Sequence, residues 1–483
     1  MSKRLRSTGN MGIMAAALVA LLFLAGAAFA QDPQGPQSDK PKPAARVYGP
    51  IGSENQDQDQ TPADTLQPDE RPLTGFQQPT VGTPLEKHSY WVPGVSYYNF
   101  IQSNGLAQGG ESGWNSNNYL AGNISLLENW SRSQLTLNYS GGGNFSTDSS
   151  IGNGWFQQLS VMQTFNWRRW QLTFLDEFSY LPQSQFGFGN GTGLSQPGIG
   201  GTLGGGTTGL GGQFSPGQSI FSAVGPRYTN TFGTQLNYQL TKRSSFTFGG
   251  LFSILRFSDP GNIDSNDYVG NAGYNYQITR ADTIGIVYRY SAYHYVGLPQ
   301  AIGDQSIQAA YGRKITGRLA LQLTGGPEIT HQRVAEGTSS QRRFVAGTGS
   351  ATITYAFEKG ALSVNYFHGV TTGSGVFLGS TTDQLTGSVS RKLSRVWSGN
   401  VNFGFARNVS QSTGSNLDYN TFYGGVSLAR PLGRNANVSL AYSAYVEKPS
   451  SGICGGGATC ASDFTTHQIS VGLSWHTRPL VLR

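Results

Sequence analysis

The sequence has few charged residues and no long apolar run beyond its N-terminus. Only 12% of its 483 residues are charged, about half of the ~25% that is usual in soluble domains. The mean hydropathy of −0.31 excludes a polytopic helical membrane protein, which needs repeated apolar runs of about 20 residues. A chain with little charge and 12% aromatic residues is also not disordered throughout, because disordered chains carry much charge and few aromatics.

Glycine, tyrosine and phenylalanine are abundant, with 67, 23 and 26 residues. Serine, threonine, asparagine and glutamine fill much of the remainder. A chain of this composition, neither apolar in blocks nor strongly charged, is typical of many short β-strands.

The first 30 residues predict a signal peptide. Lys3, Arg4 and Arg6 precede an apolar stretch over 13–25, which is too short to span a membrane. Small residues at Ala28 and Ala30 then predict cleavage after Ala30. A transmembrane anchor is the alternative interpretation, but polar, proline-rich sequence follows from residue 31 onward, so we expect an exported protein.

Residues 31–88 predict a disordered periplasmic linker rich in proline and glutamine. The net charge of +7 falls to +4 without the three bases of the signal peptide. The linker carries −4, so residues 89–483 carry +8. Export and the placement of these bases argue against nucleic acid as a partner.

From about residue 89 to 476 the chain repeats segments of 10 to 15 residues in which apolar and polar residues alternate. Leu319, Leu321 and Leu323 alternate with polar or small residues, for example. A period of two means that one face of each strand meets an apolar phase while the other face does not.

The breaks between these segments alternate between short and long. The short breaks are mostly basic and lie near 166–169, 241–244, 279–282, 315–317, 358–360, 393–395 and 431–433. The long ones lie near 140–154, 182–227, 258–264, 296–303, 331–341, 370–380, 409–416 and 447–463. This pattern predicts an all-β fold, an antiparallel up-and-down transmembrane β-barrel with tight periplasmic turns and long outer loops. Counting a first strand at 96–102, we expect about 18 strands; 16 is the alternative if the first hairpin is irregular.

Polar residues in one register predict the inward face of the barrel, and Arg289 is the clearest inward charge. The predicted pore-lining residues are Arg289, Gln235, Asn237, Asn271, Asn275, Gln322, Asn365 and Asn402. Because about 18 strands enclose more space than side chains can fill, these residues predict a water-filled bore.

Charge placement predicts a weak preference for anions. Thirteen bases lie near the tight turns and should form a basic periplasmic ring. Asp148, Asp259, Asp264, Asp267, Asp304, Glu336, Asp418 and Asp463 are expected in the outer loops. Charges on an open rim are screened within about 8 Å at physiological salt, so Arg289 and the basic ring should decide the sign.

Signals of catalysis are weak, and we expect no enzyme activity, no cofactor and no metal. His294, His331 and His368 lie toward the outer rim, but no Gly-x-Ser-x-Gly motif or metal-spaced cluster accompanies them. Asp176 and Glu177 interrupt an apolar face; adjacent strand residues point to opposite sides. A bulge that turns Asp176 inward, or a position near the lipid headgroups, would explain this pair.

This arrangement over residues 89–483 resembles the Gram-negative outer-membrane porin superfamily. The resemblance implies an outer-membrane location, contacts with lipid and lipopolysaccharide, and insertion by the barrel assembly machinery. It also implies that the longest loop, 182–227, folds inward to narrow the channel, although this loop is uncharged from residue 181 to 226. Such barrels end on an aromatic residue; here Trp475 is followed by eight further residues.

We therefore expect passive diffusion of small polar solutes through a porin-like channel. An oligomer is an open alternative to a monomer, because no residue in the sequence indicates a contact between subunits. A barrel serving adhesion, surface structure or export is the alternative, and an outer-membrane hydrolase is a more distant one.

Cys454 and Cys460 predict a disulfide in an outer loop, because the protein is exported to an oxidising compartment. The closed ring holds only seven residues, so its stabilisation should fall below the ~3 kcal/mol expected of a 15-residue loop. Replacing both residues with serine should leave heat resistance nearly unchanged in thermal unfolding. High-yield thiol labelling of the unreduced protein would contradict the bond.

Overall fold

The computed structural model describes residues 89–103, 114–147, 153–181, 226–258, 262–333, 342–373, 378–411, 418–449 and 464–481. The chain divides into two units, Met1–Arg46 and Val47–Arg483, and all described residues belong to the second. The predicted signal peptide with its cleavage after Ala30, the linker 31–88 and both cysteines lie outside the described residues, as does most of the 182–227 loop.

The regular elements of the described chain are all β-strands, and no helix there is long and apolar enough to cross a membrane. The strands are β1 (Tyr90–Ser103), β2 (Trp114–Asn129), β3 (Ser133–Ser146), β4 (Gly154–Asn166), β5 (Trp170–Leu181), β6 (Arg227–Gln239), β7 (Ser244–Phe257), β8 (Ser265–Gln277), β9 (Asp282–Tyr295), β10 (Ala301–Lys314), β11 (Leu319–Arg333), β12 (Arg342–Phe357), β13 (Gly360–Thr371), β14 (Ser380–Lys392), β15 (Ser398–Ser410), β16 (Asp418–Leu432), β17 (Ala436–Pro449), β18 (Phe464–His476) and β19 (Leu480–Val481).

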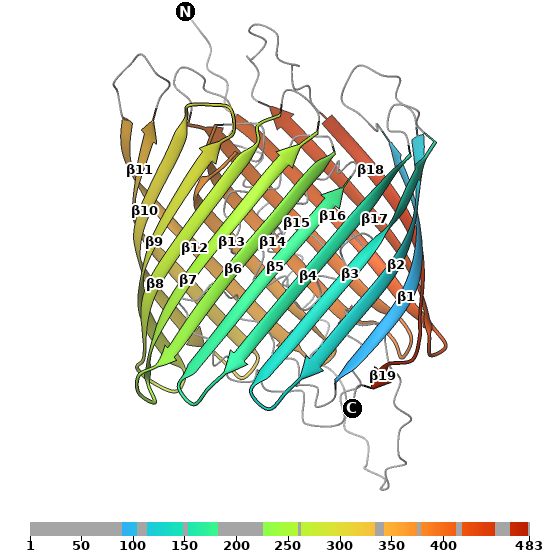
Figure 1. The fold of residues 1–483 in the computed structure, drawn as a ribbon, viewed down its shortest axis with the longest axis horizontal. Helices are drawn as coiled ribbons and strands as arrows, with labels where there is room; N and C mark the ends of the chain where they lie inside the picture. The colour runs from blue at the N-terminus through green and yellow to red at the C-terminus, as the bar shows by residue number, and fades with distance from the viewer. Residues whose placement is uncertain are drawn as a thin grey trace, which may run out of the picture. The chain divides into compact units, whose positions relative to one another are not determined.

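Each strand from β1 to β17 pairs antiparallel with the next one, and β1 pairs with β18 to close the sheet. The closing ladder runs from Gly94 opposite His476 to Gln102 opposite Gln468. Figure 1 shows the resulting barrel of tilted strands. The predicted all-β, up-and-down barrel of 18 strands is confirmed, and the alternative of 16 is wrong. The extension after Trp475 continues along β1 in the direction of β18, and β19 places two residues opposite Tyr90 and Trp91.

Along the strands, side chains alternate between an apolar outer face and a mostly polar inner face, which also carries apolar clusters around Phe100 and Leu175. Ile307 on β10 points outward and is 52% exposed, whereas Thr231 on β6 points inward and is 0% exposed. This alternation is that of a transmembrane barrel, in which strands are apolar toward lipid and polar toward the lumen. The protein is a porin-like β-barrel of the outer-membrane type.

Aromatic residues form belts at both ends of the outer face. On β4, β5 and β6, the rings of Trp155 and Tyr180 lie 4.6 Å apart and those of Tyr180 and Tyr228 lie 4.4 Å apart. At the opposite end, Trp170 and Tyr238 lie 4.2 Å apart. Such rings prefer the two membrane–water interfaces, so the apolar band lies between these belts.

Tight turns join the strands at one end of the barrel. The turns between β4 and β5 and between β6 and β7 lie where the short breaks predicted them. Arg168, Arg169, Lys242 and Arg243 are exposed in these turns. The periplasmic end, as assigned from the turn lengths, is therefore rich in basic residues.

Three acids that the sequence places in outer loops lie instead in strands. Asp267 and Asp304 belong to β8 and β10 and face inward, and Asp418 is the first residue of β16. The strands continue past their apolar stretches because the inner wall stays polar to its outer end. The polar outer end of a strand and an outer loop have similar amino-acid compositions, so the sequence does not distinguish them.

The inward and outward registers differ in their tolerance of charge. Ile307→Arg, midway along β10 on the outer face, should lower the free energy of unfolding by about 2–4 kcal/mol, because it places a cation in the apolar band. Gln322→Arg, which faces inward on β11, should cost much less. Urea unfolding in lipid bilayers measures both; equal losses would contradict the assigned register.

Candidate functional site: a constriction on the inner wall

The eight predicted pore-lining residues all lie on the inward-facing register of their strands. They are Gln235 and Asn237 on β6, Asn271 and Asn275 on β8, Arg289 on β9, Gln322 on β11, Asn365 on β13 and Asn402 on β15. The assignment follows from the residues next to them, since neighbours such as Leu236, Tyr276, Tyr288 and Leu323 point outward. Asn271 stands opposite Arg289 in the ladder between β8 and β9. The other six are spread over the wall.

A cluster of charged and polar side chains gathers around Arg289 on β9, β10 and β11. Ser306 of β10 stands opposite Arg289, and Glu328 of β11 stands opposite Ser306. Asp304 is two residues farther along β10, opposite Ser291 and Thr330. Because residues two apart on one strand share a face, these side chains all point into the interior.

Hydrogen bonds link the members of this cluster. Thr330 Oγ1 donates to Asp304 Oδ1 over 3.2 Å, and Arg289 Nε donates to Ser291 Oγ over 3.2 Å. The carboxyl groups of Asp304 and Glu328 interact with each other, and both lie within electrostatic reach of Arg289.

Beyond this cluster, toward the outer end of the barrel, the neighbouring strands β12 and β13 separate. The ladder between β12 and β13 ends at Gly349 opposite His368. β12 continues beside β11 as far as Arg342, whereas β13 continues only beside β14, to Thr371 opposite Ser380. The outer end of the β13–β14 hairpin is thus separated from its neighbour on one side.

The freed end of this hairpin packs against the inner wall of β9, β10 and β11. Tyr293 Oη donates to the carbonyl of Val370 over 3.4 Å, and Tyr295 Oη donates to that of Thr372 over 3.1 Å. The backbone N–H of Val370 donates to the Glu328 carboxylate. Val370 also joins Tyr293, Tyr295 and Ile302 in one buried cluster.

Glycine at residue 379 permits this close approach. Gly379 has a φ of 83°, a left-handed conformation that L side chains rarely adopt. A Cβ atom there would collide with the Ile302 side chain. The described ends of the hairpin, 370–373 and 378–380, thereby narrow the interior beside Arg289, Asp304 and Glu328.

The sequence assigns inward folding to the 182–227 loop instead, and residues 182–225 lie outside the described chain. The segment 370–380 reads only as one of several outer breaks rich in glycine and threonine. Tyr293 and Tyr295 bond to a chain segment 77 residues away. The local sequence of neither segment indicates such a contact. Sequence reasoning therefore missed this constriction.

Asp176 and Glu177 point to opposite sides of β5. Their strand pairs regularly, with Asp176 opposite Val161 on β4 and Phe232 on β6. The idea of a bulge that turns Asp176 inward is therefore wrong. Glu177 faces inward, while Asp176 Oδ1 accepts a hydrogen bond from Asn230 Nδ2 over 3.0 Å on the outer face.

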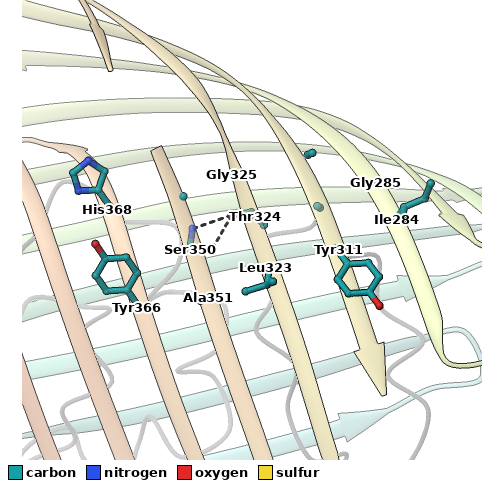
Figure 2. Close-up of a pocket in the computed structure, with 13 residues that line it drawn as sticks. Ile284, Gly285, Tyr311, Leu323, Thr324, Gly325, Ser350, Ala351, Tyr366 and His368 are labelled. Carbon is teal, nitrogen blue, oxygen red and sulfur yellow. Dashed lines mark hydrogen bonds between the residues drawn. The ribbon is translucent and has the colours of Figure 1, made fainter. Parts of the chain in front are cut away.

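His368 and Asp383 form the pair of residues that a hydrolase would use. His368 Nδ1 lies 2.6 Å from Asp383 Oδ1, and Tyr366 Oη donates to the same carboxylate oxygen over 2.9 Å. These outward-facing residues border a groove of about 750 Å³ whose lining includes Gly325, Gly349 and Ala351. Figure 2 shows His368 and Tyr366 at one end of this groove.

A nucleophile for this His–Asp pair is not evident in the groove. Its serine, Ser350, stands on the inward register of β12, with its Oγ 2.8 Å from Thr324 Oγ1. Within the described residues, no group of three or more His, Cys, Asp or Glu side chains could hold a metal ion. The groove is therefore an apolar depression on the outer face and not a catalytic site with a recognisable nucleophile.

The two tyrosine hydroxyls should hold the hairpin end in place. In the double variant Tyr293→Phe, Tyr295→Phe, two hydrogen bonds of about 0.5–1.5 kcal/mol each are lost. Amide exchange of residues 369–373 should therefore become about tenfold faster, as measured by hydrogen–deuterium exchange. Tyr288→Phe on the outer face of β9 is the control and should leave this exchange unchanged.

Comparison with known proteins gives only remote likenesses. No protein family model and no curated protein match the chain. Among solved structures it is similar to Pseudomonas aeruginosa OpdQ, with 10% identity over 81% of this chain and 98% of that one and a TM-score of 0.39. P. aeruginosa OccK2 (OpdF), solved in complex with glucuronate, gives 11% identity, 81% and 98% coverage and a TM-score of 0.40. Acinetobacter baumannii OccAB3 gives 9%, 80%, 99% and 0.40. The porin-like architecture of this chain rests on its own strand pairing.

Proposed function

We propose that the barrel is a passive diffusion channel for small polar solutes across the outer membrane. The observation that carries this proposal is the polar inner face. Threonine, serine, asparagine and glutamine side chains face inward on strands all around the barrel, and Asn271, Gln322, Asn365 and Asn402 are among those that stay partly exposed. Barrels of 16 to 18 strands leave an aqueous channel, and these groups would hydrate it.

The constriction supports a channel rather than a purely structural barrel. The hairpin end that packs on Tyr293 and Tyr295 reduces the interior at one level. Arg289, Asp304 and Glu328 stand at that level, so a solute would pass charged groups of both signs. Neither feature is needed to anchor loops at a cell surface, which is the alternative role.

The proposed channel needs no cofactor, and we do not propose an enzyme. Its partners would be lipid and lipopolysaccharide at the apolar band, the barrel assembly machinery during insertion, and the solutes themselves. A hydrolase would require a nucleophile beside His368; lipase and protease assays on the purified barrel test this alternative directly.

Conductance in planar lipid bilayers tests the channel. The wild-type barrel should give discrete current steps that grow with salt concentration. Tyr293→Ala should increase the single-channel conductance, because Tyr293 is a fully buried inward side chain that supports the hairpin. Tyr290→Ala, on the lipid-facing side of the same strand, is the matched control. An inserted wild-type barrel without any open current would refute the proposal.

A further inference from the structure

Acidic side chains outnumber basic ones on the inner face of the barrel. Away from the periplasmic strand ends, the inward-facing charged side chains that the structure describes are Glu177, Asp267, Asp304, Glu328 and Glu447 against Arg227 and Arg289. The basic surplus of the chain lies mainly in the turns. The inner wall is therefore acidic, although the protein as a whole is basic, and five of these seven side chains are buried in the wall.

The acids are concentrated at the constriction. Asp304 and Glu328 interact with each other, and Arg289 is the one cation within their electrostatic reach among the groups described there. Asp267 stands on the same wall, opposite Tyr293 in the β8–β9 ladder. Asp304 and Glu328 thus share the one guanidinium group of Arg289, while Asp267 lies within electrostatic reach of Arg256.

Buried acceptor atoms on this wall lack a donor, which is an observation independent of the charge count. Asp267 Oδ1 and Gln332 Oε1 have no hydrogen-bond partner in the structure, although the two residues are only 2% and 5% exposed. Asp267, Tyr293, Ile302 and Gln332 follow one another across four adjacent strands. The inner wall therefore has more acceptors than donors just above Asp304.

A primary ammonium group fits this arrangement. It has a positive charge, three donors and no acceptor, and charge-assisted hydrogen bonds to carboxylates are the stronger kind. A chelated metal ion fits less well, since no group of three or more metal-ligating side chains occurs among the described residues. An anion would need donors, and only Arg289 offers several of them at this level.

We propose that the channel prefers cations and that Asp304 and Glu328 bind the ammonium group of a solute at the constriction. This inference rests on the proposed channel function and names its solute class. It replaces the weak anion preference expected from Arg289 and the basic turns, because charges inside a narrow, low-dielectric wall act on a passing ion more strongly than screened charges on a rim.

Reversal potentials in a potassium chloride gradient test the sign of the preference. Potassium should be favoured over chloride by about tenfold at low salt, as expected where acidic groups outnumber basic ones in a cleft. Asp304→Asn with Glu328→Gln should lower this ratio several-fold, and Arg289→Gln should raise it. Asp383→Asn, an acid on the outer face, is the matched control and should leave the ratio unchanged. If the variant with both substitutions does not fold, Glu328→Gln alone is measured instead and should lower the ratio in the same direction.

A short diamine tests the binding part. We expect 1,5-diaminopentane to interrupt the potassium current of the wild type at much lower concentration than in the Asp304→Asn, Glu328→Gln variant, whereas the neutral 1,5-pentanediol should affect both alike. A conducting barrel that favours chloride, or one equally blocked with and without the two acids, would overturn the proposal. If the wild type carries no current, the channel function itself fails; calorimetric titration of the diamine into the detergent-solubilised barrel then decides the binding.

Discussion

The pairing of every backbone N–H and C=O inside the membrane is the constraint on which the rest of this structure depends. Hydrocarbon offers no hydrogen-bond partner, so a sheet can cross a membrane only when it has no free edge. Here the ladder between β1 and β18, from Gly94 opposite His476 to Gln102 opposite Gln468, removes both edges of the sheet. Closure in turn fixes one face of every strand toward lipid and the other toward the interior, and so determines which residues can meet a solute.

The same constraint gives the fork between β12 and β13 its significance. Above Gly349 and His368 the two strands part, and the hairpin end formed by β13 and β14 turns into the barrel. Its backbone there is satisfied by Tyr293, Tyr295 and Glu328 rather than by a neighbouring strand. Side chains of the inner wall thus take over pairing that the sheet no longer provides. Glu328 belongs both to this support and to the charged cluster, so the shape and the charge of the constriction are coupled.

Most of the fold could be predicted from the sequence, because barrel strands obey a strict period of two. The alternation around Leu319, Leu321 and Leu323 defines an outward face without knowledge of any neighbour. The placement of Arg289 and Asn402 on the inward register follows from the same rule. Strand ends were harder to locate: Asp267 and Asp304 stand beyond the apolar stretches, where a wet inner wall and an outer loop have similar composition.

The constriction could not be predicted, because it depends on contacts between distant parts of the chain. Whether Val370 pairs with a neighbouring strand or with Tyr293 is decided by tertiary structure, and both arrangements suit the same local sequence. The acidic balance of the wall was missed for a related reason. A charge count over the whole chain mixes exposed turns with buried side chains, and only the strand register separates Glu328 and Asp304 from the basic turns.

Closure between the first and last strands also governs how the protein must fold. The residues that meet in the β1–β18 ladder are separated by most of the chain, and contacts of such long sequence separation form slowly because a large loop must be closed first. Until β18 has been synthesised and docked, β1 presents an unpaired edge that other chains could join. The seam is therefore the last part of the sheet to form, and a nascent barrel remains prone to aggregation until its C-terminal strand is in place.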